Sequence, residues 1–188
     1  IDFKAESPEV LYTTQDFSTV GAEEIAMLKA RAGDNPRRRC RLCFHRDPAG
    51  TLHDMLIVIG QNAYVQPHLH IGKEESLHVV EGAAVVLTFD ETGDVTRAFD
   101  IGAPGTDRPF FYRMPEQSYH SLLIASEWLV FHESTIGPFD PSKTRAAPWS
   151  PSAGEPVEAY LEHLWKVASD HGASPFIFQI KEQVFDDL

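Results

Sequence analysis

Apolar and polar residues alternate in short runs through the middle of the chain, from residue 37 to about residue 133. In the first run, RRRCRLCFHR, the residues Cys40, Leu42 and Phe44 alternate with charged and polar residues. Period-two alternation is typical of strands, and turn-forming Gly, Pro, Asn and Asp separate the successive runs. Many short strands predict an all-β fold, a single antiparallel β-barrel or sandwich. The lack of a helix-length pattern between them argues against a parallel α/β sheet.

Helical spacing occurs on either side of this region. One predicted helix begins near Thr19 and ends at Gly33. A second carries an apolar stripe from Val157 to Ala168, which either docks on the β region or forms a dimer contact. Trp149 lies in a Pro-rich arm before it and is expected to be buried. The predicted parts are an N-terminal segment with one helix (1–36), a β-barrel (37–140), and an arm, helix and tail packed on the barrel (141–188), with one tail strand at 176–180.

The length of 188 residues suits one domain with a substantial core. The net charge of −12 makes the protein a poor general binder of nucleic acid or anionic membrane, because phosphates attract basic surfaces. No apolar run approaches the roughly 20 residues of a membrane-spanning helix, and the first residues show no signal-peptide core, so we predict a cytoplasmic protein. The local cluster of Arg37, Arg38, Arg39 and Arg41 is interpreted as a solvated strand edge in preference to an anion-binding patch.

The two cysteines, Cys40 and Cys43, are spaced as in redox and zinc pairs. On a strand, however, residues three apart point to opposite faces, so the two thiols should diverge. Redox pairs usually lie at the start of a helix, where the helix dipole lowers the thiol pKa. We therefore interpret both residues as structural cysteines.

Histidines supply the candidate chemistry. His68 and His70 lie at positions i and i+2 of a predicted strand, so they share a face with Cα atoms about 6.6 Å apart, and both imidazoles can bind one metal ion. A third histidine, His120, lies on a later strand and shares its face with Leu122 and Ile124. A histidine on an apolar face is more often a core residue than a ligand, but the pair at His68 and His70 favours a metal site.

A glutamate follows the histidine pair after a turn that returns the chain along the neighbouring strand. Glu75 is preferred to Glu74 as the residue facing the histidines, because Leu77 and Val79 then face the interior with it. In this register His78 faces away from the site. The sequence thus predicts one inward carboxylate beside the imidazoles.

These residues resemble the two sequence motifs of the cupins. The first motif is matched by His68-x-His70, four residues, Glu75, six residues and Gly82, and the second by Pro115-x-x-x-x-His120. The resemblance implies a small antiparallel barrel of the jelly-roll type, a double-stranded β-helix, with one divalent metal ion per chain (Zn, Fe, Mn, Ni or Co). Its implied ligands are His68, His70, Glu75 and His120. The order of segments over residues 22–151 resembles the WbuC-type cupin-fold metalloproteins of surface-polysaccharide gene clusters.

Further residues are candidates for a substrate pocket. Arg41, Cys43 and His45 share one strand face, which lines the pocket or else is the outer, solvated face. Tyr64 either joins them or packs at the mouth of the barrel. Glu133 either accepts a hydrogen bond from a ligand imidazole or is a surface charge at a strand end, and the second reading is preferred slightly.

Three functions fit these expectations. The first is an isomerase or epimerase that uses the metal as a Lewis acid on a small polar molecule, sugar-like or sugar-nucleotide-like. The second is a non-haem iron dioxygenase, and the third is a non-catalytic metal-binding or ligand-binding module. The expected partners are a small-molecule ligand and a second copy of the chain, since two-fold pairs are the commonest assemblies.

Overall fold

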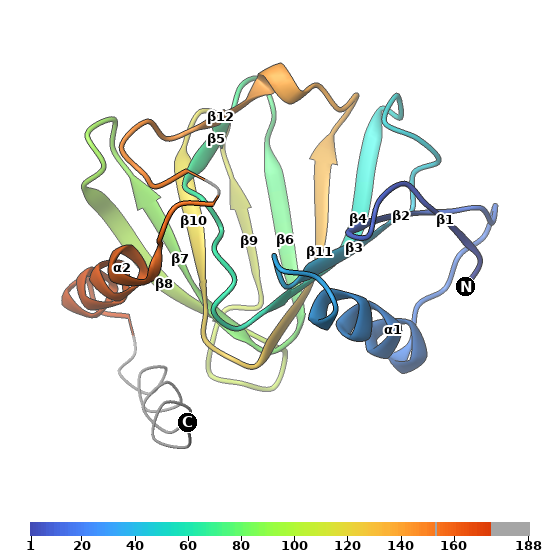
Figure 1. Ribbon diagram of the computed structural model, residues 1–188, viewed down its shortest axis with the longest axis horizontal. Helices are drawn as coiled ribbons and strands as arrows, with labels where there is room; N and C mark the ends of the chain where they lie inside the picture. The colour runs from blue at the N-terminus through green and yellow to red at the C-terminus, as the bar shows by residue number, and fades with distance from the viewer. Residues whose placement is uncertain (153, 174–188) are drawn as a thin grey trace.

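The computed structural model describes residues 1–152 and 154–173, and these residues form two β-sheets and two α-helices (Figure 1). The seven-stranded sheet has the order β1 (Phe3–Ala5), β2 (Val10–Thr13), β3 (Arg39–Cys43), β4 (Leu52–Gly60), β11 (Trp128–Ile136), β6 (Glu75–Glu81) and β9 (Phe111–Met114). The five-stranded sheet has the order β12 (Thr144–Ala146), β5 (His68–His70), β10 (Tyr119–Ile124), β7 (Ala83–Phe89) and β8 (Val95–Gly102). The all-β expectation is confirmed.

The two sheets pack face to face. Leu77 and Val79 of β6 and Phe131 of β11 lie in one buried cluster with Leu122 and Ile124 of β10, so side chains of both sheets share a core. We call the face of the seven-stranded sheet that is turned toward the five-stranded sheet the interior face. Within the described residues the two sheets remain separate hydrogen-bonded units, so the architecture is a β-sandwich and no closed barrel is seen.

One strand pair departs from the expected antiparallel arrangement. β2 and β3 are parallel, whereas the other strand pairs of the described residues are antiparallel. Parallel neighbours need a crossover connection, and helix α1 (Ala22–Gly33) supplies it. The predicted N-terminal helix is therefore confirmed, and it packs on β3 and β4 with Leu28 and Ala32 buried. Its first turn is capped by Glu24, whose carboxylate accepts a hydrogen bond from the backbone N–H of Gly21 at 2.8 Å.

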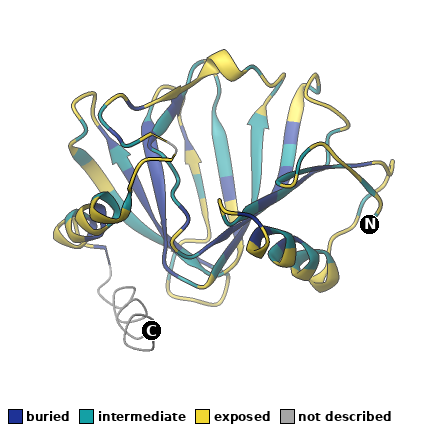
Figure 2. Ribbon diagram, in the orientation of Figure 1, coloured by how far each residue is buried: buried dark blue, intermediate teal, exposed yellow. Residues whose placement is uncertain are grey.

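The Pro-rich arm packs on the outer side of the five-stranded sheet. After a short 3-10 helix, η1 (Pro141–Lys143), the arm forms β12 beside β5. The Trp149 ring lies 5.0 Å from that of Phe89 and 5.8 Å from that of Tyr119, centroid to centroid. Helix α2 (Glu158–Asp170) buries Leu164 and Trp165 in the same cluster, so it packs on the five-stranded sheet, the first of the two readings of this helix. The solvent-facing sides of both helices are exposed in Figure 2.

The strand predicted at 176–180 lies outside the described residues. Among the helices that are described, none is long and apolar enough to span a membrane.

The two thiols diverge as expected. Cys40 is buried beneath α1, whereas Cys43 pairs with Met55 of β4 on the interior face. Both cysteines are free, and burial raises the pKa of Cys43 to about 11, which leaves it a poor nucleophile. These observations match structural cysteines.

The arginine cluster divides between two faces and edges of the sheet. Arg37 and Arg39 form ion pairs with Glu9 at 3.3 and 3.0 Å, and the Arg38 guanidinium lies over the Trp128 ring. These three match the solvated-edge interpretation. Arg41 shares the interior face with Arg39, since the two pair in register with Ile57 and Ile59 of the core between the sheets. Arg41 differs from Arg39 because, within the described residues, it has no ion pair like that of Arg39 with Glu9.

Candidate metal centre

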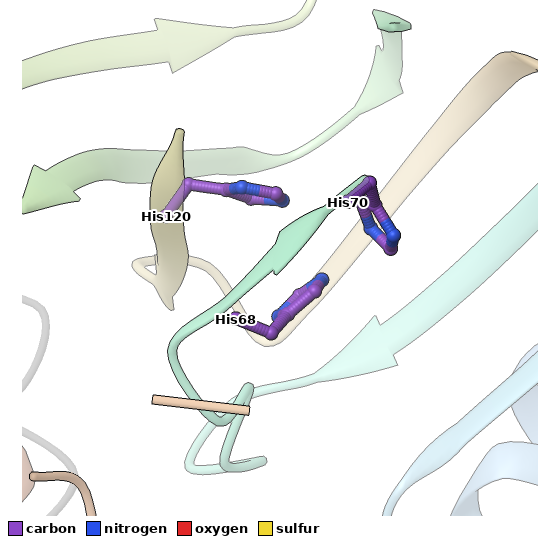
Figure 3. Close-up of side chains that lie close together, drawn as sticks. All are labelled: His68, His70 and His120. Atoms are coloured by element: carbon purple, nitrogen blue, oxygen red, sulfur yellow. The ribbon is translucent and has the colours of Figure 1, made fainter. Parts of the chain in front are cut away.

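Three histidines from two adjacent strands converge at one end of the sandwich. His68 and His70 lie on β5, and His120 lies on β10 directly opposite His68 in the antiparallel register. One ring nitrogen from each lies within 4.8 Å of the others. The ring centroids are 4.5 to 5.6 Å apart, and the rings approach one another in Figure 3. This spacing could hold one metal ion.

Each histidine is oriented by an oxygen atom at its Nδ1 atom. The carbonyl oxygens of Gln66 and Ser118 lie 2.7 and 2.9 Å from Nδ1 of His68 and His120. The Thr144 hydroxyl lies 3.1 Å from Nδ1 of His70. A carbonyl oxygen only accepts, so Nδ1 of His68 and His120 must carry a proton, and in a neutral ring Nε2 then offers its lone pair. Outer oxygen partners of this kind are usual for metal-binding histidines.

Glu75 reaches the triad from the opposite sheet. Its two carboxylate oxygens lie 3.0 Å from Nε2 of His70 and 3.5 Å from Nε2 of His120. Burial would raise the pKa of Glu75, but the hydrogen bonds and charges of the two histidines outweigh burial and hold that pKa well below its usual range. The carboxylate is therefore ionised and faces Nε2 of His120, an atom with a lone pair of its own in the neutral ring. Two acceptors in contact require a cation or a proton between them.

Within the triad, His68 stays neutral near pH 7. Burial, with the neighbouring His120 and His70, lowers the pKa of His68 to about 4. Three imidazoles and a carboxylate are a usual donor set for Zn and for the transition metals Fe, Mn, Ni and Co. The residues present thus fit a divalent ion, and His68, His70, Glu75 and His120 remain its predicted ligands. Glu74, the rejected alternative, forms an ion pair with Arg113 on the outer side.

Glu133 faces the interior and not the surface. In the sheet register Glu133 pairs with Met55 on one side and Leu77 on the other. Burial and the charge of Glu75 raise the pKa of Glu133 to about 8. The preferred reading of Glu133 as a surface charge at a strand end does not fit this position. No hydrogen bond joins it to a described histidine, so it does not act as the acceptor for a ligand imidazole either.

The four pocket candidates separate into two groups. Arg41 and Cys43 lie on the interior face, and both interact electrostatically with Glu133. His45 stacks on His53 with ring centroids 3.8 Å apart. The Tyr64 hydroxyl donates to a carbonyl of the arm, that of residue 151, at 2.9 Å. Arg41 and Cys43 are thus near the centre, whereas Tyr64 contacts the arm.

Tyr112 is an interior polar residue that the sequence analysis did not name. It pairs with Leu77, next to Glu133 in the same cross-strand row. Burial, with the charges of Glu133 and Glu75, raises the pKa of Tyr112 above its usual range. The alternation Phe111, Tyr112, Arg113 and Met114 would have placed it inward, had the pairing of β9 with β6 been known.

Comparisons with known proteins assign neither family nor activity. A family model described as a domain of unknown function (DUF6016) matches residues 20–101, less than half of the chain. No curated protein matches the sequence.

Solved structures share parts of the fold. They include a candidate sugar phosphate isomerase from Acidithiobacillus ferrooxidans (21% identity, TM-score 0.37, 47% of this chain and 51% of that one). Others are an oxalate decarboxylase from Lactobacillus farciminis (22%, 0.43, 61% and 31%) and procruciferin, an 11S globulin from Brassica napus (20%, 0.43, 63% and 31%). The chain thus spans about half of the first protein and about a third of the other two. We draw no function from likenesses at this level.

Proposed function

We propose that this protein is a metal-binding cupin in which His68, His70, Glu75 and His120 hold one divalent ion, and that it acts on a small polar, sugar-like molecule. One observation carries the proposal. Three imidazoles with their Nδ1 atoms held by oxygen partners turn toward one another, and a carboxylate from the facing sheet meets them. Residues that lie up to 52 positions apart rarely assemble four such donors without a ligand to share.

The cupin assignment rests on the agreement of sequence spacing with this geometry. The first motif covers β5 and β6, and the second motif leads into β10. Gly82, which closes the first motif, adopts a φ of +83°, where glycine is favoured. The two facing sheets support a jelly-roll arrangement. We propose that the chain is related to the WbuC-type proteins. We also propose a homodimer as the assembly, which a mass measurement in solution would check.

The donor set favours a reactive centre over a closed structural one. Four side-chain ligands leave a position open on a five- or six-coordinate ion, and a divalent ion there would supply Lewis-acid polarisation of a ligand oxygen. The chain itself places three polar side chains, those of Arg41, Glu133 and Tyr112, on the interior face. A purely structural site has no need of such polar groups. A non-catalytic binding module would bind the same molecules without turnover.

Metal analysis of the purified full-length chain tests the proposal. Wild type should bind about one divalent ion per chain, and His70→Ala should retain a small fraction of it, because His70 supplies one of the four donors. His78→Ala is the matched control, since His78 is exposed and lies near the Phe110 ring on the other side of β6; this variant should bind metal as wild type does. Unchanged metal content in His70→Ala would contradict the proposed ligand set.

The identity of the metal separates the two enzymatic alternatives. Turnover of sugar-like molecules with Zn or Mn would support Lewis-acid chemistry. Predominant iron, with oxygen consumed when a candidate substrate is added, would instead indicate the iron dioxygenase. Metal binding without turnover of any candidate substrate would support the third function, a non-catalytic binding module.

A further inference from the structure

Arg41 carries a charge that no described residue neutralises by contact. Its neighbours Arg37 and Arg39 both pair with Glu9, but Arg41 forms no ion pair or side-chain hydrogen bond within residues 1–152 and 154–173. It is only partly exposed and lies on the interior face. Removing an arginine from water is costly unless an anion meets it. A guanidinium in this position is therefore suited to an anion that arrives from solution.

Glu133 and Tyr112 offer hydrogen-bonding groups in the same region. They flank Leu77 in one cross-strand row of the interior face, and within the described residues neither side chain has a hydrogen-bond partner. Neither is among the fully enclosed polar atoms that lack a partner, so both polar groups remain accessible. Their accessible oxygen atoms can form hydrogen bonds with the hydroxyl groups of a ligand.

These groups lie close to the proposed metal ligands. Glu75 and Leu77 are successive inward residues of β6, with Cα atoms about 6.6 Å apart, so the row of Glu133 and Tyr112 is next to that of Glu75. The electrostatic influence of Glu75 and His120 on Glu133 agrees with this placement, and Arg41 acts on the same carboxyl group from the β3 side. Glu133 therefore lies between the proposed metal ligands and Arg41, so a ligand that extends along this part of the interior face can contact both.

We infer that the interior face is the specificity surface of the metal site, and that it selects a small hydroxylated anion. Arg41 binds the carboxylate or phosphate group, since its planar fork matches both anions. Glu133 and Tyr112 hydrogen-bond the hydroxyl groups, and an oxygen at the other end of the molecule takes the open metal position. This inference rests on the proposed function and adds to it the charge of the ligand and the residues that recognise it.

Binding of matched probes to metal-loaded full-length protein tests the inference. The probes are gluconate, glucose 6-phosphate and neutral glucose, measured by calorimetry or by the shift in melting temperature. At least one anionic probe should bind wild type more tightly than glucose. Gluconate as the tighter probe would indicate a carboxylate ligand, and glucose 6-phosphate a phosphate ligand. An equal response to the three probes, including none, would overturn the inference.

Arg41→Met should weaken the preferred anionic probe about ten- to a hundredfold, the usual effect of losing hydrogen bonds to a charged group, and should leave glucose unchanged. Arg41→Lys should recover part of the loss, because the charge returns without the planar fork. Arg39→Met is the matched control: it removes the same charge from the same strand, but from an arginine already paired with Glu9. Wild-type affinity in Arg41→Met, or the same loss in both variants, would overturn the role of Arg41.

Metal content, measured on each preparation, separates this inference from the proposed function. Wild-type protein that binds no divalent ion would contradict the metal site itself. Normal metal content in every variant, with anion binding that does not depend on Arg41, would contradict only the specificity surface.

Discussion

Replacing Thr144 by valine would show how the arm supports the metal centre. The Thr144 hydroxyl lies 3.1 Å from Nδ1 of His70, and the two residues are directly opposite in the register of β12 and β5. A partner at Nδ1 fixes the orientation of the ring, so Nε2 stays turned toward the other donors. Valine keeps the branched shape and the strand pairing but removes the hydroxyl. We expect weaker metal binding with unchanged stoichiometry at saturation.

The size of the effect follows from the exposure of this contact. Loss of an outer partner lowers metal affinity about 10- to 100-fold. Thr144 is exposed, so water replaces the hydroxyl in part, and we expect the lower limit, about tenfold or 1.4 kcal/mol. At saturating metal this loss appears as reduced stability of the folded protein. For a chain of this size it corresponds to a melting temperature lower by about 3–6 °C.

The assay titrates metal-free protein with Zn²⁺ or Mn²⁺ and records affinity and melting temperature for wild type, Thr144→Val and Thr144→Ser. Serine restores the hydroxyl and should bind metal nearly as well as wild type. The metal-free forms should differ by no more than about 0.5 kcal/mol in free energy of unfolding, as is usual for exposed positions. Wild-type affinity in Thr144→Val would refute the orienting role of this hydroxyl.

Two further predictions concern stability. Gly82→Ala should lower the free energy of unfolding by more than the roughly 1–2 kcal/mol that a left-handed backbone costs a non-glycine residue. The additional loss is expected because a Cβ at Gly82 would lie 2.1 Å from the Trp128 carbonyl oxygen. Gly105 has a similar φ, but a Cβ there would meet no atom within 4 Å, so Gly105→Ala should show the backbone cost alone. Urea unfolding of both variants measures the difference, and equal losses would contradict it. Because burial and Glu75 raise the pKa of Glu133 to about 8, the folded state holds this proton more tightly than the unfolded state does. The resulting stability is present below the unfolded pKa and is lost as pH rises toward 8. In metal-free protein Glu133→Gln should therefore gain stability relative to wild type between pH 5 and pH 9. A stability difference between the two proteins that does not change with pH in urea unfolding would contradict the raised pKa of Glu133.

Strand periodicity was sufficient where only one face of a strand is apolar. In β6, Leu77 and Val79 are buried while His78 is exposed, so the pattern placed Glu75 inward. The same reasoning separated Cys40 from Cys43 on β3. In β6 burial alternates from Leu77 to Val80, and one inward residue fixes the orientation of the others.

Periodicity failed for Glu133 because both faces of β11 are apolar at its start. Val130 is buried under α1, and Leu129 and Phe131 are buried between the sheets. Because α1 covers the outer face of this strand, residues on both faces are apolar, and the difference in polarity that usually identifies the inner face is absent. The pairing of β11 with β6 also shifts register between Val130 and Phe131, which no pattern within one strand reveals. The parallel pairing of β2 escaped prediction for a related reason, since its four residues are too few to show a period.

The arm shows that a segment with little strand pattern can determine the geometry of a site. β5 has only three residues and lies between β10 and β12, so β12 supplies its pairing on one side. In that register Thr144 is opposite His70 and Ala146 is opposite His68, while Trp149 secures the arm against Phe89 and Tyr119 of the same sheet. A short strand held on one side only would fray, and the two imidazoles would lose their common direction. The histidine motif therefore specifies the donors, and their alignment depends on a Pro-rich segment more than seventy residues later.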